Sequence, residues 1–315
     1  MTNSPRNEHM LHFGLLAVLA VLFFVMSDYH DGNLARIMVL AVYATGYNLL
    51  FGYTGLLSLG HALFFAAGMY GLGLPMHLFG LSALPAMLTG ILSAAAVSAV
   101  IGFLALRTTG VAFMIVTLMF AQAGFLTVLH FGKYTRGDEG FVIQQAERVI
   151  AGFDLSTPTN RYFAAFLIFS AVFLAVAALL RTSFGRCLVA IRENEDRARM
   201  LGYDVWTHKF LAVIASGTIS GIAGASYALL FGYAGATFAS VQYSILPLLW
   251  VLLGGAGTTI GPLLGTIFAF YLVDLASEVT TAHLLVVGLT IVLLTLFAPH
   301  GLAGELRRRG LRWLP

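Results

Sequence analysis

Few side chains in this sequence could do chemistry, and they fall into three groups. The first group consists of polar side chains inside or beside long apolar runs: Asn48, Thr54, Ser58, His61, Thr117 and Gln122. The second is the charged stretch of residues 181–209. The third is a glycine-rich segment that contains Gly254, Gly255, Gly257, Gly261 and Pro262. In a membrane, the neutral polar groups could line a pathway for a small solute or hydrogen-bond neighbouring helices to one another.

Catalytic and metal chemistry find little support in these residues. The nine histidines show no H-E-x-x-H or paired metal-ligand spacing, and the single Cys187 excludes a multi-cysteine metal site. The sequence has no G-x-x-x-x-G-K-[ST] phosphate loop. Residues 255–261 superficially resemble a dinucleotide loop, but apolar helices flank them instead of a strand and a soluble helix. We therefore expect no enzyme and no cofactor or metal in this chain.

The charged stretch of residues 181–209 predicts a short helix over residues 195–201. Asn194 is a good N-cap, Glu195 and Asp196 place negative charge on the first turn, and Gly202 can end the helix in a left-handed conformation. Apolar residues at helical spacing predict one buried face: Leu188, Ile191, Ala198 and Leu201. Because two helical turns are unstable alone in water, this helix must dock on its own chain or on another protein. The alternative is a solvated loop with ordinary arginines.

The composition indicates an integral membrane protein. Of the 315 residues, 59% are hydrophobic and 10% are charged, whereas a soluble domain carries about 25% charged residues. Apolar runs of about 17 to 25 residues without two-residue alternation predict transmembrane helices instead of a barrel. The net charge of +3 does not indicate nucleic-acid binding, because the basic residues lie beside apolar runs and not along one polar face.

The apolar runs predict about ten spans. Single spans are expected at residues 11–26, 37–51, 57–79, 84–106, 111–131, 162–180, 210–231 and 284–297. The apolar signal over residues 244–275 is too long for one ordinary span, and the glycine-rich segment interrupts it, which predicts two helices joined by a glycine hairpin. The expected fold is an all-α polytopic bundle forming one domain over residues 1–315.

Positive charge predicts the orientation of these spans. With both ends in the cytoplasm, twelve of the 17 Lys and Arg residues fall inside, and the outside keeps Arg36, Lys133, Arg136, Arg148 and Arg161. This orientation predicts an external loop over residues 132–161, a cytoplasmic loop over residues 181–209 and a basic cytoplasmic tail over residues 299–315. The glycine hairpin falls in the cytoplasm as well.

Two further features concern transport. No predicted span has Asp, Glu, Lys or Arg in its middle third, which argues against ion coupling within this chain and favours energy supplied by a partner. The sequence LLFGYTG at residues 49–55 recurs as LLFGYAG at residues 229–235, and the two copies leave the membrane on opposite faces in this topology. The echo predicts an inverted repeat, and coincidence in an apolar composition is the alternative.

Four motifs in order resemble one known family. They are GYTGLLSLGHA at residues 52–62, TRGDEG at 135–140, FGR with IRENE within 184–195, and GGAGT with GP within 254–262. Together they are similar to LivM-type permeases of branched-chain amino acid ABC transporters, over about residues 46–301. Leu56 stands where the family often has Gln, and Arg136 and Glu139 vary its usual T-G-G-x-x-G turn. Because the family includes permeases for urea and short amides, these substrates remain alternatives.

The resemblance implies a subunit of the bacterial inner membrane in an inverted-repeat type II ABC importer that works by alternating access. Its partners would be a second homologous permease, two ATP-binding cassette subunits that hold ATP and Mg²⁺, and a periplasmic substrate-binding protein. The segment that would couple to the ATPases contains Gly185, Arg192, Glu193, Asn194, Glu195, Asp196 and Gly202. An ion-coupled secondary carrier working alone is the alternative from another class.

Overall fold

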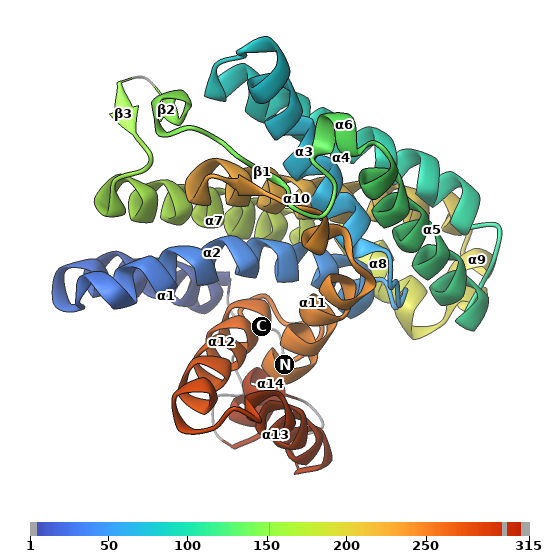
Figure 1. Cartoon of the computed structure of the whole chain (residues 1–315). Coiled ribbons are helices and arrows are strands. Elements are labelled where there is room, and N and C mark those ends of the chain that lie inside the picture. The colour runs from blue at the N-terminus through green and yellow to red at the C-terminus, as the bar shows by residue number, and fades with distance from the viewer. Residues whose placement is uncertain (1–4, 151, 298–300, 310–315) are drawn as a thin grey trace.

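A central helix, α2 (Asp28–Asn48), organises the fold. The computed structural model describes every residue except 1–4, 151, 298–300 and 310–315. Ile37, Met38 and Val39 are consecutive and fully buried, so α2 is enclosed on all sides by other helices. It contacts α7 (Pro158–Arg181), α10 (Val205–Phe231), α11 (Val241–Gly254) and α12 (Gly261–Val279). Segments far apart in sequence therefore share one core around α2 (Figure 1).

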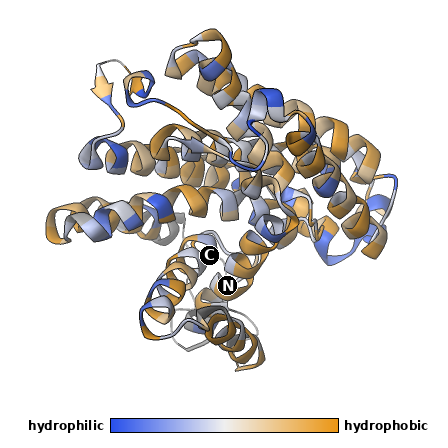
Figure 2. Cartoon of the chain, viewed as in Figure 1, coloured by the Kyte–Doolittle hydropathy of each residue, from blue (hydrophilic) through white to orange (hydrophobic). Residues whose placement is uncertain are grey.

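The remaining elements are mostly helical as well. The other long helices are α1 (Pro5–Val25), α3 (His61–Phe79), α4 (Ala83–Ala105), α5 (Val111–His130) and α13 (His283–Phe297). The short ones are the π-helix η1 (Leu49–Tyr53), α6 (Gly132–Thr135), the 3-10 helix η2 (Gln145–Glu147), α8 (Ser183–Glu193), α9 (Glu195–Met200), the 3-10 helix η3 (Ala236–Ala239) and α14 (Gly301–Arg309). Figure 2 shows apolar residues covering the helices, with hydrophilic residues mainly in the connections.

The helices confirm an all-α polytopic membrane protein. Within the described residues, seven helices are long and apolar enough to cross a bilayer. Three more apolar helices are shorter, namely Met10–Val25 within α1, α11, and α13 with 15 residues. About ten spans is therefore a fair description. The glycine hairpin between α11 and α12 is also confirmed.

Several predicted boundaries are wrong for a common reason. Residues 181–209 are not a loop with one short helix, because α8 and α9 fill residues 183–200 and α10 already begins at Val205. Likewise α2 begins at Asp28 and α7 at Pro158, inside segments predicted as turn or loop. Charged and polar residues end an apolar signal without ending a helix: Arg and Glu in α8 and α9 are good helix formers, an Asp is favourable at the N-terminus of α2, and Pro158 fits the first turn of α7. Residues 57–60 are the opposite case, since α3 begins only at His61.

The bundle has two distinct ends. At the hairpin end, residues 255–260 connect α11 to α12. At the strand end, β1 (Phe141–Val142) pairs antiparallel with β4 (Tyr233–Ala234), and β2 (Val149–Ile150) pairs with β3 (Phe153–Asp154). The two copies of the LLFGY echo lie at opposite ends, as predicted, but the first is a π-helix whereas the second ends α10 at a left-handed Gly232. An inverted repeat therefore stays a prediction.

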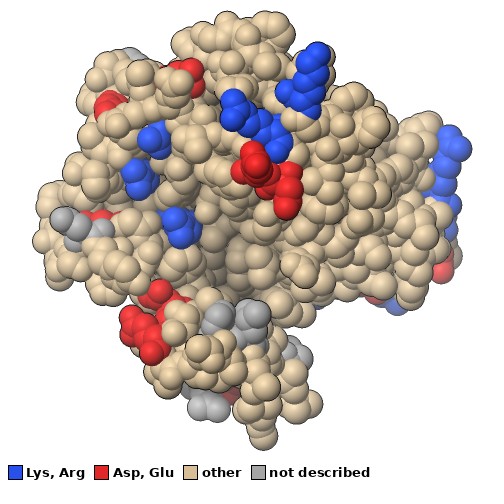
Figure 3. Space-filling view, viewed as in Figure 1, with Lys and Arg blue, Asp and Glu red and all other residues tan. Residues whose placement is uncertain are grey.

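The C-terminal helices form a smaller group beside the main bundle. Figure 1 shows α12, α13 and α14 below α2, with α11 leading into them. Figure 3 shows a hollow between this group and the larger bundle on the face in view. The predicted basic tail over residues 299–315 lies partly outside the described residues, and the part that is described forms α14.

Candidate functional site

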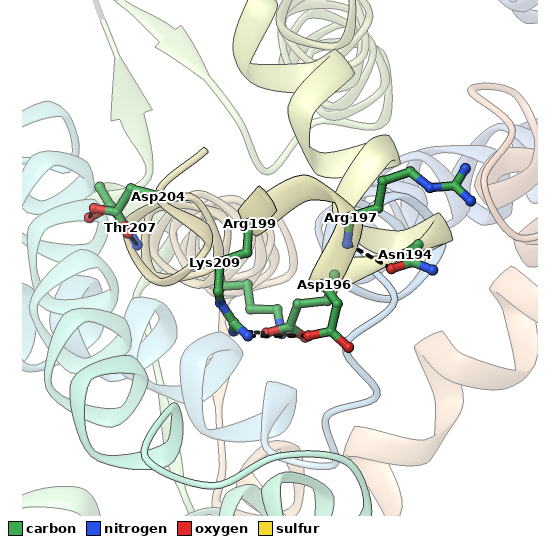
Figure 4. A network of polar contacts seen from close by, with 8 residues as sticks. Asn194, Asp196, Arg197, Arg199, Asp204, Thr207 and Lys209 are labelled. Carbon is green, nitrogen blue, oxygen red and sulfur yellow. Dashed lines mark hydrogen bonds and ion pairs between the residues drawn. The ribbon is translucent and has the colours of Figure 1, made fainter. Parts of the chain in front are cut away.

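The helices α8 and α9 form a tight pair at the hairpin end. The Thr182 hydroxyl caps α8 by accepting from the Gly185 amide, and the Asn194 side chain caps α9 by accepting from the Arg197 amide at 2.8 Å (Figure 4). Gly202, with a φ of 87°, follows α9 in the left-handed region. The predicted cap and terminator are thus confirmed as local structure. Their role in coupling stays a prediction.

One face of this pair is buried against its own chain. Ile191 and Ala198 are buried as predicted, together with Cys187 and Val205. Leu201 was expected to join them, but it is 70% exposed because the chain turns at Gly202 before it can reach the core. The predicted docking of α9 is therefore satisfied in part within the chain, and one side of α9 remains open.

Charged side chains fix α9 to the start of α10. Glu195 forms ion pairs with both Arg199 and Lys209, and Arg199 also pairs with Asp196 at 3.3 Å (Figure 4). Asp204 caps α10 by accepting from the Thr207 amide at 3.1 Å. Hydrogen bonds from Thr207 hold the pKa of the Asp204 carboxyl below its ordinary value, so this cap stays ionised near neutral pH.

Arg192 connects α8 to the end of the central helix. Its guanidinium donates a hydrogen bond to the Gly52 carbonyl in η1. The side chain also lies against Gly55 and Gly257, where an added Cβ would come within 3.1 Å and 2.6 Å of it. One arginine therefore contacts two segments that are remote in sequence, namely residues 52–55 and the hairpin at Gly257. Sequence reasoning missed the Gly52 carbonyl, because a backbone acceptor leaves no mark in residue types.

Asn48 joins the central helix to the glycine hairpin. Its amide nitrogen donates to the Thr258 carbonyl and its amide oxygen accepts from the Gly257 amide, both at 2.9 Å. The side chain is 2% exposed. Because both ends of the amide are bonded to backbone, Asn48 links the helix to the hairpin, and its role in a pathway stays a prediction.

The hairpin is built on close backbone contact. Gly255 and Gly257 have φ of 113° and 77°, which side chains rarely adopt. Pro262 lies in the first turn of α12, where its missing amide hydrogen is no loss. A Cβ at Gly261 would lie 2.5 Å from the Gly255 carbonyl oxygen, so the two helices can approach only with glycine there.

The segments at the hairpin end enclose a pocket of about 430 Å³. Its walls come from the loop after η1, the turn between α4 and α5, and the α8–α9 pair. Charges of both signs line it: Arg192, Glu193, Glu195, Arg199 and Lys209. This surface can accept a charged group from a partner but contains no arrangement of an acid, a base and a nucleophile.

His61 lies in a fully buried hydrogen-bonded chain. Its Nε2 lies 2.8 Å from the Ser216 hydroxyl oxygen, and that hydroxyl donates to the Gly46 carbonyl at 2.6 Å. Because the single hydroxyl hydrogen of Ser216 is used on Gly46, the Nε2 of His61 carries a hydrogen and donates to Ser216. This chain joins α3, α10 and α2, and the role of His61 in a pathway stays a prediction.

The other predicted pathway residues divide into two groups. Thr54 donates to the Leu49 carbonyl, Ser58 accepts from the Gly60 amide, and Thr117 accepts from the Leu59 amide at 3.1 Å. These three buried side chains hold the loop between η1 and α3. Gln122 lies elsewhere, on an exposed face of α5. The structure therefore gathers three of the six residues around one loop, places Asn48 against the hairpin and His61 against Ser216, and separates Gln122 from them.

Comparisons with known proteins point to one family. The family described as "Branched-chain amino acid transport system / permease component" matches residues 30–295. The high-affinity branched-chain amino acid transport system permease protein LivM of Escherichia coli is 28% identical over 311 residues, 91% of this chain and 73% of that protein. A probable branched-chain amino acid transport permease protein LivM of Methanocaldococcus jannaschii is 37% identical over 106 residues, covering 33% of this chain and 30% of that protein.

Proposed function

This chain belongs to the family of branched-chain amino acid transport system permease components, and we propose that it is the membrane-spanning permease subunit of an ATP-driven ABC importer for branched-chain amino acids. It is a transport subunit and not an enzyme. ATP and Mg²⁺ bind to partner chains, and the membrane helices alternate between outward and inward openings.

The hairpin end faces the cytoplasm in this proposal, and the strand end faces the periplasm of a bacterial inner membrane. The excess of Lys and Arg on the segments of the hairpin end supports this orientation. Both terminal helices also reach that end. His12 of α1 lies 3.3 Å from the Thr259 hydroxyl, and Gly301 at the start of α14 lies against Gly255. The N- and C-termini are then both cytoplasmic.

Each partner has a surface that suits it. The open side of α9 presents Met200, which is 81% exposed, and Leu201 next to the charged Asp196, a surface that suits the ATP-binding subunits. The exposed Gln122 on α5 suits the second permease, because an amide is unfavourable against lipid. The strand end would receive the periplasmic substrate-binding protein.

The contact between Arg192 and the Gly52 carbonyl is the observation that carries the coupling mechanism. When an ATPase subunit moves α9, α8 moves with it through their shared buried face. Arg192 then pulls on the end of the central helix, and Asn48 transmits the movement to the hairpin of α11 and α12. A local displacement at the cytoplasmic side thus reaches the helices around α2.

Two variants separate docking from transmission in the reconstituted importer. Met200→Glu should weaken ATPase docking, so both assembly and ATPase activity fall. Arg192→Gln should leave assembly and basal ATPase activity intact but reduce stimulation by the binding protein about tenfold, the effect of one charge-assisted hydrogen bond. Glu147→Gln at the strand end is the control. Unchanged stimulation in Arg192→Gln would contradict the coupling role, and gradient-driven uptake by the isolated chain without ATP would favour a secondary carrier.

A further inference from the structure

Three arginines gather at the strand end around the last turn of α10. Arg36 of α2 and Arg161 of α7 place their guanidinium carbons 5.2 Å and 5.7 Å from the centre of the Phe231 ring. Arg148 donates to the Leu230 carbonyl at 3.3 Å. Figure 3 shows basic side chains along this part of the surface. Arg36, Arg148 and Arg161 belong to the few basic residues that the positive-inside rule places on the external side, so their clustering needs an explanation.

In the part of the chain that the structure describes, Arg36, Arg148 and Arg161 form no ion pair. Arg161 donates to the Ser156 carbonyl at 2.6 Å, and the Nε atoms of both Arg148 and Arg161 are buried without a hydrogen-bond partner. Asp154 influences Arg148 electrostatically, but its Oδ1 already accepts from the Ser156 amide and hydroxyl. Arg148 and Arg161 are half-buried and Arg36 is exposed, and like charges gathered in this way are stabilised by an anion.

An apolar groove of about 710 Å³ lies directly beside the cluster. Its lining includes Leu230, whose carbonyl holds Arg148, and Asn160, the neighbour of Arg161. From there it continues along α7 to Leu167 and Ile168, about 12 Å by helical rise. Ile150 of β2 and Phe153 of β3 also line it. The groove and the arginines are thus one continuous surface.

We propose that the arginine cluster and this groove bind one anionic phospholipid, with its phosphate on the guanidinium groups and an acyl chain in the groove. Arg161 is in the first turn of a membrane span, where headgroups lie, and arginine forks match phosphate geometry. The groove walls are open to the surroundings, since Leu167 is 70% and Leu84 59% exposed. A free phosphate or an acidic protein surface would use the cluster but leave the groove empty.

Native mass spectrometry of the purified full-length chain can test this site. The probes are phosphatidylglycerol, phosphatidylcholine with the same acyl chains, and inorganic phosphate. One phosphatidylglycerol should be retained with about tenfold preference over phosphatidylcholine, because both lipids carry the phosphate but only phosphatidylglycerol has a net negative charge that attracts the arginine cluster. Arg148→Gln with Arg161→Gln should remove the preference. Lys133→Gln, another basic residue of the strand-end side, is the matched charge control and should retain it.

A second variant tests the groove without changing charge. Ala164→Trp fills it and should lower phosphatidylglycerol retention about tenfold while Arg148 and Arg161 remain, since burying several methylene groups contributes at least that factor. Equal retention in the arginine variant would overturn the proposal. Displacement by inorganic phosphate, with no effect of Ala164→Trp, would indicate a simple anion site. If the arginine variant keeps its lipid retention but the reconstituted importer that contains it is stimulated less by the binding protein, the cluster contacts an acidic protein surface instead. Monodisperse elution of each variant verifies folding.

Discussion

At the residue scale, the buried polar side chains hold backbone groups that are remote in sequence. Asn48 binds the Thr258 carbonyl and the Gly257 amide, and His61 reaches Gly46 through Ser216. Inside an apolar bundle an unpaired backbone group is costly, so each of these bonds fixes one segment against another. Arg192 does the same at the surface by reaching the Gly52 carbonyl.

Replacing Asn48 tests this role. Asn48→Ala leaves the Thr258 carbonyl and the Gly257 amide without partners in a buried site, so we expect unfolding free energy to fall by about 2 to 4 kcal/mol. Equilibrium unfolding of the purified chain in mixed detergent micelles measures the loss. Gln122→Ala, on the exposed face of α5, should change it little. Equal stability of the two variants would argue that Asn48 does not hold the hairpin.

At the element scale, the contact between α11 and α12 depends on small residues along both helices. Gly265 of α12 lies against the Trp250 carbonyl of α11, and Gly254 lies against the Gly261 carbonyl, each so closely that no Cβ fits. Without a hydrophobic force between helices in lipid, this close approach supplies the packing that holds the pair together. The close contact with α12 also helps the 14-residue helix α11 to pack against α2.

Glycine substitutions in these helices should therefore have unequal effects. Gly265→Ala forces α11 and α12 apart, and overpacking of this kind costs about 1 to 3 kcal/mol. Gly288→Ala is the matched control, because nothing lies within 4 Å of its added Cβ. Thermal unfolding in detergent should show a lower midpoint for Gly265→Ala and almost no shift for Gly288→Ala. Equal shifts of the two midpoints would mean that helix propensity determines the change in stability, and that the close contact between α11 and α12 does not.

At the scale of the whole molecule, α2 connects two ends for which different roles are proposed. The proposed ATPase surface and the hairpin lie at one end, and the paired strands with the arginine cluster lie at the other. In an apolar 18-residue stretch of the span that begins in α2, 89% of the residues are buried, so this helix can transmit a movement along the bundle with little exposure to lipid. In the proposed orientation, the end with more Lys and Arg faces the cytoplasm.

Cysteine labelling tests this orientation. Asp138→Cys and Asp196→Cys are compared in right-side-out vesicles with a membrane-impermeant maleimide. The first should react at once, whereas the second should react only after lysis. Burial raises the pKa of the Cys187 thiol, so the native cysteine is less reactive at neutral pH, and a Cys187→Ala background removes it. Labelling of Asp196→Cys in intact vesicles would reverse the proposed orientation.

The sequence alone determined the features that depend on neighbouring residues. Apolar runs of bilayer length predicted a helical membrane bundle, the glycine-rich segment predicted a hairpin, and Asn194 and Gly202 marked a helix start and a turn. Each follows from hydropathy, capping or backbone freedom within a few residues. The same local basis explains the errors, because charge ended the apolar signal at residues 181–209 while α8 continued through it.

Only the tertiary structure decided which distant groups meet. Asn48 and Thr258 are 210 positions apart, and Arg36 and Arg161 share the ring of Phe231. Such contacts depend on how helices pack and on which backbone carbonyls a π-helical turn leaves free. The order of residue types along the chain does not reveal how the helices pack or which carbonyls are free. The packing therefore settled that Thr54, Ser58 and Thr117 hold one loop, that Gln122 lies apart, and that three neighbouring arginines lie beside an apolar groove.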